Sequence, residues 1–143
     1  MEIRKAIFSD VDEVYFLHTE LKTNAFDKNK YNNLFKRELQ DPHAYHLVAV
    51  DGQKIIGELA GKIEERLTHD RKVATIEGLI VSSGFRNRGI GKELFLAFEE
   101  IARKNDCEKI EVSSKITRVD AHRFYTDKVG MNKTHYRFSK YYS

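Results

Sequence analysis

The sequence predicts an α/β fold in which helices pack against a mixed, mostly antiparallel sheet. Two observations support this class: strand-like and helix-like segments alternate along the chain, and a strong hairpin signal, Asp51-Gly52, lies between two apolar strands. The apolar residues are spread evenly over residues 1–143, and no repeat, low-complexity tract or linker interrupts them. We therefore expect a single domain over residues 1–143.

The first part of the chain predicts one strand and two helices. Glu2–Ala6 is typical of a strand, and Ser9 is the expected N-cap of the helix that follows. A second helix is expected over Asn29–Gln40, and Asp41-Pro42 ends it. The apolar stripe of the first helix recurs near the 3.6-residue period at Val11, Val14, Tyr15, Leu17 and Leu21.

The middle of the chain predicts three strands and a long helix. Tyr45–Val50 and Lys54–Glu64 form the hairpin, and Val73–Val81 is the next strand. The helix after it is expected to end near Asn105. Its buried stripe consists of Ile90, Leu94, Phe98, Ile101 and Ala102.

The last part predicts a strand, a short helix and a final strand. Lys109–Ser114 is the first of these, and Asp120–Lys128 forms the helix, with Gly130 just past its C-terminus. Lys133–Tyr142 is rich in aromatic residues, which favour strands.

The composition is that of a globular chain with a core. Of its 143 residues, 41% are hydrophobic, and the net charge of +3 is mixed with acidic residues along the chain, so nucleic acid is not an expected partner. No apolar run approaches the roughly 18 residues of a membrane span, and the first residues lack the layout of a secretory signal. One cysteine, Cys107, excludes an internal disulfide. We expect a cytoplasmic protein that does not bind membranes, with Cys107 a structural residue.

A basic, glycine-bearing turn joins the third middle strand to the long helix. The first helical turn leaves about four backbone N–H groups unpaired, and the helix dipole adds positive charge there, so an anion is stabilised. Glycine at positions 89 and 91 lets phosphates approach the backbone, and basic side chains can pair with their oxygens. The expected pyrophosphate-binding residues are Arg86, Asn87, Arg88, Gly89, Ile90, Gly91 and Lys92.

Two well-known glycine loops do not fit this turn. A nucleoside-triphosphate loop needs Ser or Thr after Gly-Lys, but Glu93 follows Lys92 and its charge would oppose phosphates. The dinucleotide fingerprint requires a third glycine where Leu94 stands.

What remains is the pattern Arg86-x-x-Gly89-x-Gly91 immediately after a strand that ends in valine. It resembles the acetyl-coenzyme A loop of the GCN5-related N-acetyltransferases (GNAT). A second landmark of that family, an Ala-x-x-Phe-Tyr helix that ends in glycine and an apolar residue, is matched by Ala121, Phe124, Tyr125, Gly130 and Met131.

The resemblance implies a fold, a cosubstrate and catalytic residues. In the GNAT fold the strands Val73–Val81 and Lys109–Ser114 would splay apart, and the pantetheine arm of acetyl-CoA would pair with backbone groups of Leu79, Ile80 and Val81. Phe124 would pack in the core or along this arm. Tyr125 matches the family's proton donor to the leaving thiolate; otherwise it is an aromatic residue at a helix–sheet junction.

An amine attacks a thioester only as the free base, so the reaction needs a proton acceptor or a suitable electrostatic setting. Glu77 is the candidate base, because it lies on the strand beside the expected cofactor and can act directly or through a water. The alternative is a charged residue on a half-exposed strand.

Within the family, the chain is most similar to the aminoalkylphosphonate N-acetyltransferases, which implies direct attack by a small primary amine in a ternary complex. The matching segments are Glu20-Leu21-Lys22, Phe26-Asp27, Asp41-Pro42, Tyr45-His46-Leu47, Arg118, the run from Asp120 to Tyr125, and Tyr136-Arg137-Phe138. A protein or polyamine acetyltransferase and a noncatalytic coenzyme A-binding module remain as alternatives.

A phosphonate dianion needs two or more cationic or donor groups. The candidates are His69, Arg118, His122 and Arg137, although Arg118 can equally contact coenzyme A. The six histidines show no His-Glu-x-x-His spacing, so no metal site is predicted, and a divalent cation that bridges a phosphonate stays open. A homodimer with Tyr136, Tyr141 and Tyr142 at its interface also stays open.

Overall fold

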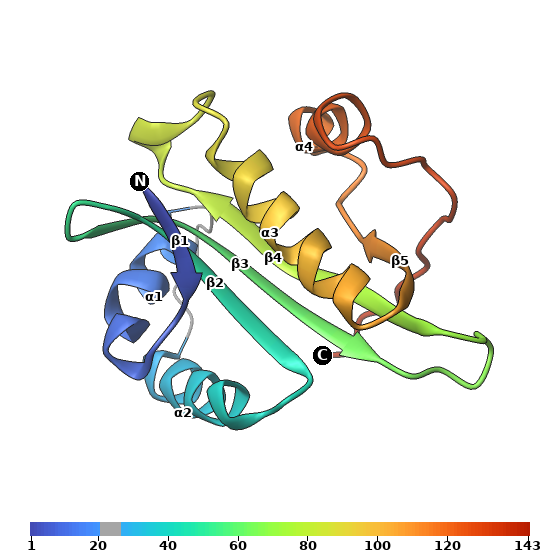
Figure 1. Ribbon diagram of the computed structural model, residues 1–143, viewed down its shortest axis with the longest axis horizontal. Helices are drawn as coiled ribbons and strands as arrows, with labels where there is room; N and C mark the ends of the chain where they lie inside the picture. The colour runs from blue at the N-terminus through green and yellow to red at the C-terminus, as the bar shows by residue number, and fades with distance from the viewer. Residues whose placement is uncertain (21–26) are drawn as a thin grey trace. The chain divides into compact units, whose positions relative to one another are not determined.

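The computed structural model describes residues 1–20 and 27–143 and divides into two compact units, Met1–Glu111 and Val112–Ser143, each of which is described by itself. The predicted Leu21 and the segments Leu21-Lys22 and Phe26 lie outside the described residues. The elements of the first unit, labelled in Figure 1, are β1 (Glu2–Lys5), α1 (Val11–Thr19), α2 (Lys28–Gln40), β2 (Ala44–Asp51), β3 (Lys54–Glu64), β4 (Lys72–Val81), α3 (Ile90–Lys104) and β5 (Cys107–Val112, whose last residue belongs to the second unit).

The strands form one sheet in the order β1-β2-β3-β4-β5. The pairs β1–β2, β2–β3 and β3–β4 are antiparallel, and the predicted hairpin turns at Asp51-Gly52 between β2 and β3. The predicted α/β class, with a mostly antiparallel sheet and flanking helices, is confirmed. The last strand of the sheet begins and ends two residues earlier than the expected Lys109–Ser114.

The pairing of β3 with β4 contains an irregularity at Glu77. Ala60 pairs with Gly78 and Gly61 pairs with Ile76, so Glu77 has no residue opposite it. An extra residue of this kind is a β-bulge, which changes the face to which the following side chains point. The bulge lies two residues before Leu79, where the cofactor arm is expected.

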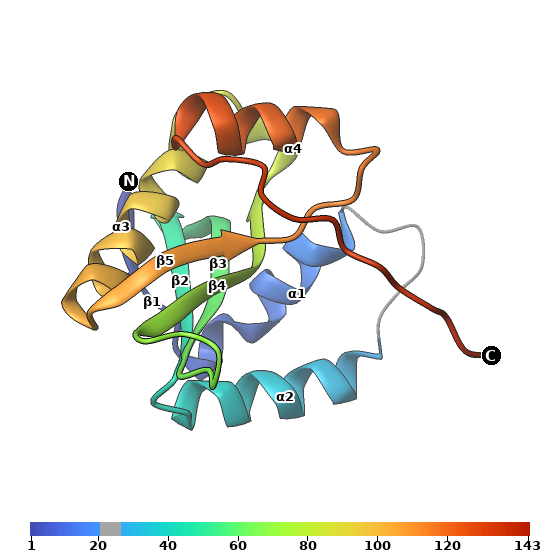
Figure 2. The same ribbon diagram turned by 90° about the vertical axis from the view of Figure 1, so that its right-hand side faces the viewer.

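Helices cover both faces of the sheet, with α3 on one side and α1 on the other (Figure 2). On the α3 face, Phe98 packs so closely over Gly61 that a Cβ there would lie 2.6 Å from the phenyl ring. On the other face, α1 and α2 contribute Val11, Val14, Leu17 and Phe35 to a buried cluster that includes Val48, Ile55 and Ile80 of the sheet. The side chain of Ile80 therefore faces α1 and α2.

The start of α1 differs from the prediction. The expected N-cap, Ser9, lies inside a short 3-10 helix, Phe8–Asp10, and the α-helix begins at Val11. The Asp10 carboxylate accepts hydrogen bonds from the Ile7 amide (2.8 Å) and from both terminal nitrogens of Arg4 (2.8 and 3.0 Å). Ser9 is wrong as the cap: the α-helix begins after Asp10, and the Asp10 side chain bonds back to the Ile7 amide and not to the first amides of α1.

The predicted second helix is confirmed and begins one residue earlier than expected. The Asp27 carboxylate caps α2 by accepting hydrogen bonds from the amides of Asn29 (2.9 Å) and Lys30 (3.2 Å). The helix ends at Gln40, before Asp41-Pro42, as the sequence predicts.

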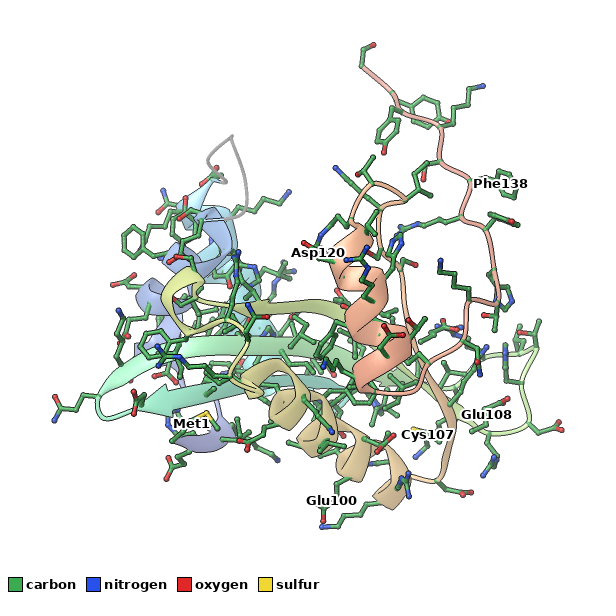
Figure 3. The ribbon with its side chains drawn as sticks, turned by 90° about the horizontal axis from the view of Figure 1, so that it is seen from above. Met1, Glu100, Cys107, Glu108, Asp120 and Phe138 are labelled. Carbon is green, nitrogen blue, oxygen red and sulfur yellow. The ribbon has the colours of Figure 1, made fainter. Side chains whose placement is uncertain are left out.

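The second unit contains α4 (Val119–Arg123), which continues as one π-helical turn, Phe124–Lys128, and Gly130 follows with a positive φ of 72°. The predicted strand Lys133–Tyr142 is wrong, because the described segment 129–143 contains no strand. Aromatic residues favour strands only where a neighbouring strand and a packed face receive them. Here Phe138, labelled in Figure 3, is 92% exposed.

None of the described helices is both long enough and apolar enough to cross a membrane.

The Arg4–Asp10 pair generates a prediction about stability. Arg4 lowers the pKa of Asp10 below its usual value, so this contribution to the free energy of unfolding is present above the unfolded pKa of about 3.9 and is lost as the pH falls through the lower folded pKa. We expect Asp10→Asn to cost about 1–3 kcal/mol at neutral pH, and we expect the difference from wild type to shrink below about pH 4. Urea unfolding at several pH values measures this, with the exposed Asp12→Asn as control.

A difference between Asp10→Asn and wild type that stays constant down to about pH 2.5 would contradict this account of Asp10.

Candidate functional site

The turn between β4 and α3 is fixed by backbone hydrogen bonds. The Ser82 amide donates to the Ile56 carbonyl (2.8 Å), and the Phe85 amide closes a 3-10 turn onto the Ser82 carbonyl (2.9 Å). Asn87 (φ 63°) and Gly89 (φ 79°) then adopt the left-handed conformation that glycine and asparagine tolerate best. These two residues direct the chain into α3.

The N-terminus of α3 is open. Among the described residues, no side chain caps this helix, and its first backbone bond runs from the Glu93 amide to the Gly89 carbonyl (3.0 Å). The amides of Ile90, Gly91 and Lys92 therefore have no partner within the helix. Partial positive charge collects there, as an anion site requires.

Cationic side chains surround this helix end. Arg86, Arg88 and Lys92 are exposed. Arg86 donates from Nε to the Val81 carbonyl (3.3 Å), and the Arg88 guanidinium lies 5.1 Å from the ring centroid of Phe85. The contacts made by Arg86 and Arg88 hold two positive charges beside the turn. The residues present therefore fit a diphosphate group.

The end of β4 is held in the sheet on one edge. Leu79, Ile80 and Val81 pair with Leu59, Glu58 and Gly57 of β3. Ile80 is buried, while Leu79 and Val81 are half-buried. The backbone groups of residues 79–81 that face β3 are therefore taken up by the sheet. The sequence analysis assigns this segment to the pantetheine arm.

Glu77 lies on the bulge and reaches solvent. Its side chain is 47% exposed, and its Oε1 lies 3.3 Å from Nζ of Lys62, which also lies 3.6 Å from Glu38. The negative charge of Glu77 is the main cause that raises the pKa of Lys62. The candidate base is therefore a carboxylate paired with an ammonium group that stays charged.

A chain of charged residues runs through the interior from this point. Glu38 Oε1 lies 2.7 Å from Nε2 of His46, whose Nδ1 lies 3.0 Å from Glu58 Oε2. The other oxygen of Glu58 lies 2.6 Å from Nε2 of His18. We call the six residues His18, Glu58, His46, Glu38, Lys62 and Glu77 the polar network.

The two buried members of the polar network shift each other's ionisation. Burial alone lowers the pKa of His46, but the hydrogen bonds and charges of Glu58 and Glu38 outweigh it, so the pKa of His46 is raised. Burial alone raises the pKa of Glu58, but the bonds from His18 and His46 outweigh it, so the pKa of Glu58 is lowered. His46 is therefore charged where Glu58 is ionised.

The sequence analysis missed all of the polar network except Glu77. The available signals were single polar residues at core positions: Glu58 stands among apolar residues in the middle of β3, and His46 lies between Tyr45 and Leu47 in β2. A buried charge in a strand needs a partner, but periodicity alone does not say which residue provides it.

Tyr125 lies in the π-helical turn of the second unit. Burial raises the pKa of its phenol, and the charge of Arg118 opposes this only in part. Its ring contacts that of Phe124 edge to face, with the ring centroids 5.4 Å apart. Tyr125 is therefore protonated at neutral pH, which is the form that can donate a proton.

The predicted phosphonate ligands fall in both units. In the second unit, Arg118 precedes α4, Nε2 of His122 is held 2.8 Å from the Lys115 carbonyl, and Arg137 is exposed on the C-terminal segment. His69 belongs to the first unit, where a surface pocket of about 330 Å³ is lined by Thr68, His69, Asp70, Arg71 and Glu108. The two carboxylates of this pocket oppose a dianion.

Among residues 1–20 and 27–143, no group of three or more His, Cys, Asp and Glu side chains is arranged to hold a metal ion. Cys107 is half-buried at the start of β5, where Figure 3 labels it, and burial raises the pKa of its thiol. A raised thiol pKa disfavours the nucleophilic thiolate, which agrees with the structural role expected from the sequence.

Comparison with known proteins identifies the family. The model of the acetyltransferase (GNAT) family matches residues 11–131, which is most of the chain. The chain belongs to this family.

Individual relatives agree with this assignment. The aminoalkylphosphonate N-acetyltransferase of Salmonella typhimurium is 34% identical over 139 residues, covering 97% of this chain and 90% of that protein. An uncharacterized N-acetyltransferase of Bacillus subtilis, YhdJ, is 32% identical over 128 residues, covering 90% of this chain and 89% of that protein. The crystal structure of a transcriptional regulator from Bacillus halodurans C-125 matches with a TM-score of 0.90, at 27% identity and 99% coverage of both chains.

As a GNAT member, the chain is an acyltransferase that uses acetyl-CoA and acts on amines. The fold class and the family resemblance predicted from the sequence are both confirmed. The residue-level assignments of the site stay predictions.

The left-handed residues of the β4–α3 turn give a prediction about cofactor binding. We expect Gly89→Ala to weaken coenzyme A binding about tenfold, because a Cβ at φ 79° costs on the order of 1–2 kcal/mol and shifts the amides of α3. Isothermal titration calorimetry with coenzyme A measures this. Asn87→Gly is the matched control, since glycine tolerates φ 63° and should bind within about twofold of wild type.

Equal affinities for Gly89→Ala and Asn87→Gly would contradict a cofactor site at this turn.

Proposed function

We propose that this GNAT enzyme acetylates small primary amines that carry a phosphonate group. The observation that carries the proposal is the 34% identity to an aminoalkylphosphonate N-acetyltransferase across 97% of this chain. The shared features quoted above include residues that the general fold does not require, such as His122, Arg123 and Arg137. We also propose that both compact units belong to one catalytic domain, because the family model runs across their boundary.

The open end of α3 supports a proposed cofactor site. The amides of residues 90–92 and the basic side chains of Arg86, Arg88 and Lys92 bind the diphosphate of acetyl-CoA. Asn87 and Gly89 shape the turn, and the backbone of Leu79–Val81 pairs with the pantetheine arm. Phe124 packs beside this arm.

The chemical step is direct acetyl transfer in a ternary complex. The amine nitrogen forms a bond to the thioester carbon, and the carbon–sulfur bond breaks with its electron pair moving to sulfur. Tyr125 donates its phenolic proton to the leaving thiolate, which suits its protonated state at neutral pH. Glu77, which solvent reaches, takes the proton of the ammonium form, directly or through one water, so that the amine attacks as the free base. The proton that the nitrogen loses on attack passes to solvent, from which Tyr125 regains its own.

The acceptor's phosphonate is proposed to bind cationic and donor groups. Arg118, His122 and Arg137 in the second unit supply them, and no carboxylate contacts Arg118 or Arg137 among the described ion pairs. Arginine pairs in two-point geometry with phosphonates and carboxylates alike, so the preference for a phosphonate comes from its second negative charge and third oxygen, which a single carboxylate would leave without a counterpart. His69 remains a predicted fourth contact. The proposal leaves room for a homodimer and for a divalent cation that bridges the phosphonate.

The acceptor proposal predicts a substrate preference. We expect aminomethylphosphonate and 2-aminoethylphosphonate to give kcat/KM at least about 100-fold above glycine and β-alanine, their carboxylate counterparts, because unpaired arginines penalise the wrong acid group. A thiol-release assay with acetyl-CoA measures this, with spermidine and a lysine peptide in the same panel.

Better turnover of spermidine or the peptide would replace the phosphonate proposal with a polyamine or protein acetyltransferase. Coenzyme A binding without acetylation of any amine in a broad panel would replace it with a binding module.

The proton-donor role of Tyr125 predicts a kinetic defect. We expect Tyr125→Phe to lower kcat by about 100-fold with little change in coenzyme A affinity, because general acid assistance is lost while the ring remains. Steady-state kinetics and calorimetry separate the two effects. Tyr136→Phe, on the exposed C-terminal segment, is the matched control and should keep wild-type kcat.

A kcat for Tyr125→Phe within about threefold of wild type would remove Tyr125 from the chemistry.

A further inference from the structure

One end of the polar network is an imidazole whose orientation is fixed. His18 Nε2 lies 2.6 Å from Oε1 of Glu58, and the Glu58 side chain is only 1% exposed. Glu58 sits in β3 directly opposite Ile80 of β4. A buried carboxylate anchored in the middle of a sheet cannot follow the ring, so the hydrogen bond determines where the ring points.

The hydrogen bonds also fix the tautomer of His18. Both ring nitrogens of His46 lie against carboxylates, Glu58 at 3.0 Å and Glu38 at 2.7 Å, and ionised carboxylates only accept hydrogen bonds. His46 therefore donates from both nitrogens as an imidazolium, and Glu58 is ionised. It follows that His18 donates from Nε2, so the lone pair of the neutral ring is on Nδ1.

Solvent reaches the His18 end of the network. The His18 side chain is 23% exposed, whereas those of Glu58 and His46 are buried. Among the described residues, no hydrogen bond reaches His18 Nδ1. Tyr31 of α2 also faces the ring, at 6.0 Å between centroids, and burial raises the pKa of Tyr31, so it stays neutral.

His18 also lies beside the strand that is expected to hold the thioester. A Cβ on Gly78 would be 3.6 Å from Cε1 of His18, so the ring packs over this glycine. Gly78 comes immediately before Leu79–Val81, and α1 lies against this face of the sheet (Figure 2). Glu77 precedes Gly78 on the bulge. The two ends of the polar network, His18 and Glu77, therefore flank one position of β4.

We propose that His18, held by Glu58, is a further catalytic residue, which takes the proton that the acceptor amine loses as it attacks the thioester. The proton moves from the amine nitrogen to Nδ1 of His18 while the nitrogen–carbon bond forms and the carbon–sulfur bond breaks. The resulting imidazolium then returns its proton to water. The proposal rests on the proposed cofactor arm at Leu79–Val81 and is independent of the phosphonate.

The charge of the network favours this transfer. Glu38, Glu58 and Glu77 contribute three negative charges, and Lys62 and His46 contribute two positive ones, which leaves one negative charge when His18 is neutral. Protonation of His18 neutralises the network. Glu77 attracts the ammonium form of the substrate and accepts the proton that leaves the free base, and His18 takes the second proton as that amine attacks.

The pH dependence of kcat/KM tests this assignment, with whichever amine is turned over best. The variants are His18→Gln, which keeps an amide donor for Glu58, Glu77→Gln, and His43→Gln as a control at an exposed histidine. We expect activity of wild type and His43→Gln to fall on the acid side as the base is protonated. His18→Gln should lose this limb and about 100-fold or more of the plateau rate, while Glu77→Gln should keep the limb at a lower rate.

A second measurement does not depend on turnover. Nitrogen NMR of the ring should show His18 protonated on Nε2 in wild type, and in Glu58→Gln the tautomer should change while coenzyme A still binds. The proposal is overturned if His18→Gln keeps the acid limb, if Glu77→Gln removes it instead, or if Nδ1 carries the proton in wild type. Failure of the phosphonate proposal would appear only in the substrate panel.

Discussion

The fold is organised around one buried carboxylate. Glu58 stands in the middle of β3 with 1% of its side chain exposed, and an uncompensated charge at such a place costs several kcal/mol. Its two oxygens accept hydrogen bonds from His18 of α1 and His46 of β2, and the other ring nitrogen of His46 donates to Glu38 of α2. The same charge thus fixes both helices against one face of the sheet. It also orients the polar side chains that contact it.

The bulge at Glu77 is the second constraint, because it decides which side chains share that face. Glu77 is the extra residue of the β3–β4 pairing. At this position its side chain lies next to Lys62, which also contacts Glu38. The β3–β4 ladder continues on both sides of the bulge, so the sheet keeps its hydrogen bonds. On the opposite face Gly61 admits Phe98, which brings α3 close to the sheet and holds its open N-terminus at the end of β4.

Part of the structure could be predicted from interactions between residues that are close in sequence. The β4–α3 turn, the Asp51-Gly52 hairpin and the C-terminal end of α2 follow from residues adjacent in sequence, and the structure has them as expected. The predictions for Ser9 and Lys133–Tyr142 failed because the outcome depended on partners. Asp10, bonded to Arg4 and to the Ile7 amide, closes a 3-10 turn that includes Ser9, and no strand pairs with the aromatic segment in the described chain. The polar network was missed for the same reason. His18 and Glu58 are 40 residues apart, and no periodicity links them.

The distribution of charge bears on the kind of acceptor the enzyme suits. An aminoalkylphosphonate is positive at one end and negative at the other, so recognition needs both an anionic and a cationic set of groups. The first unit holds three carboxylates of the polar network, Glu38, Glu58 and Glu77, and the second unit contains Arg118 and Arg137 without a carboxylate partner among its described ion pairs. Under the proposed function a polyamine could pair with carboxylates but would carry no acid group for the arginines. Selectivity would then come from this mismatch as much as from favourable contacts, since a wrong acceptor leaves a charged group unpaired.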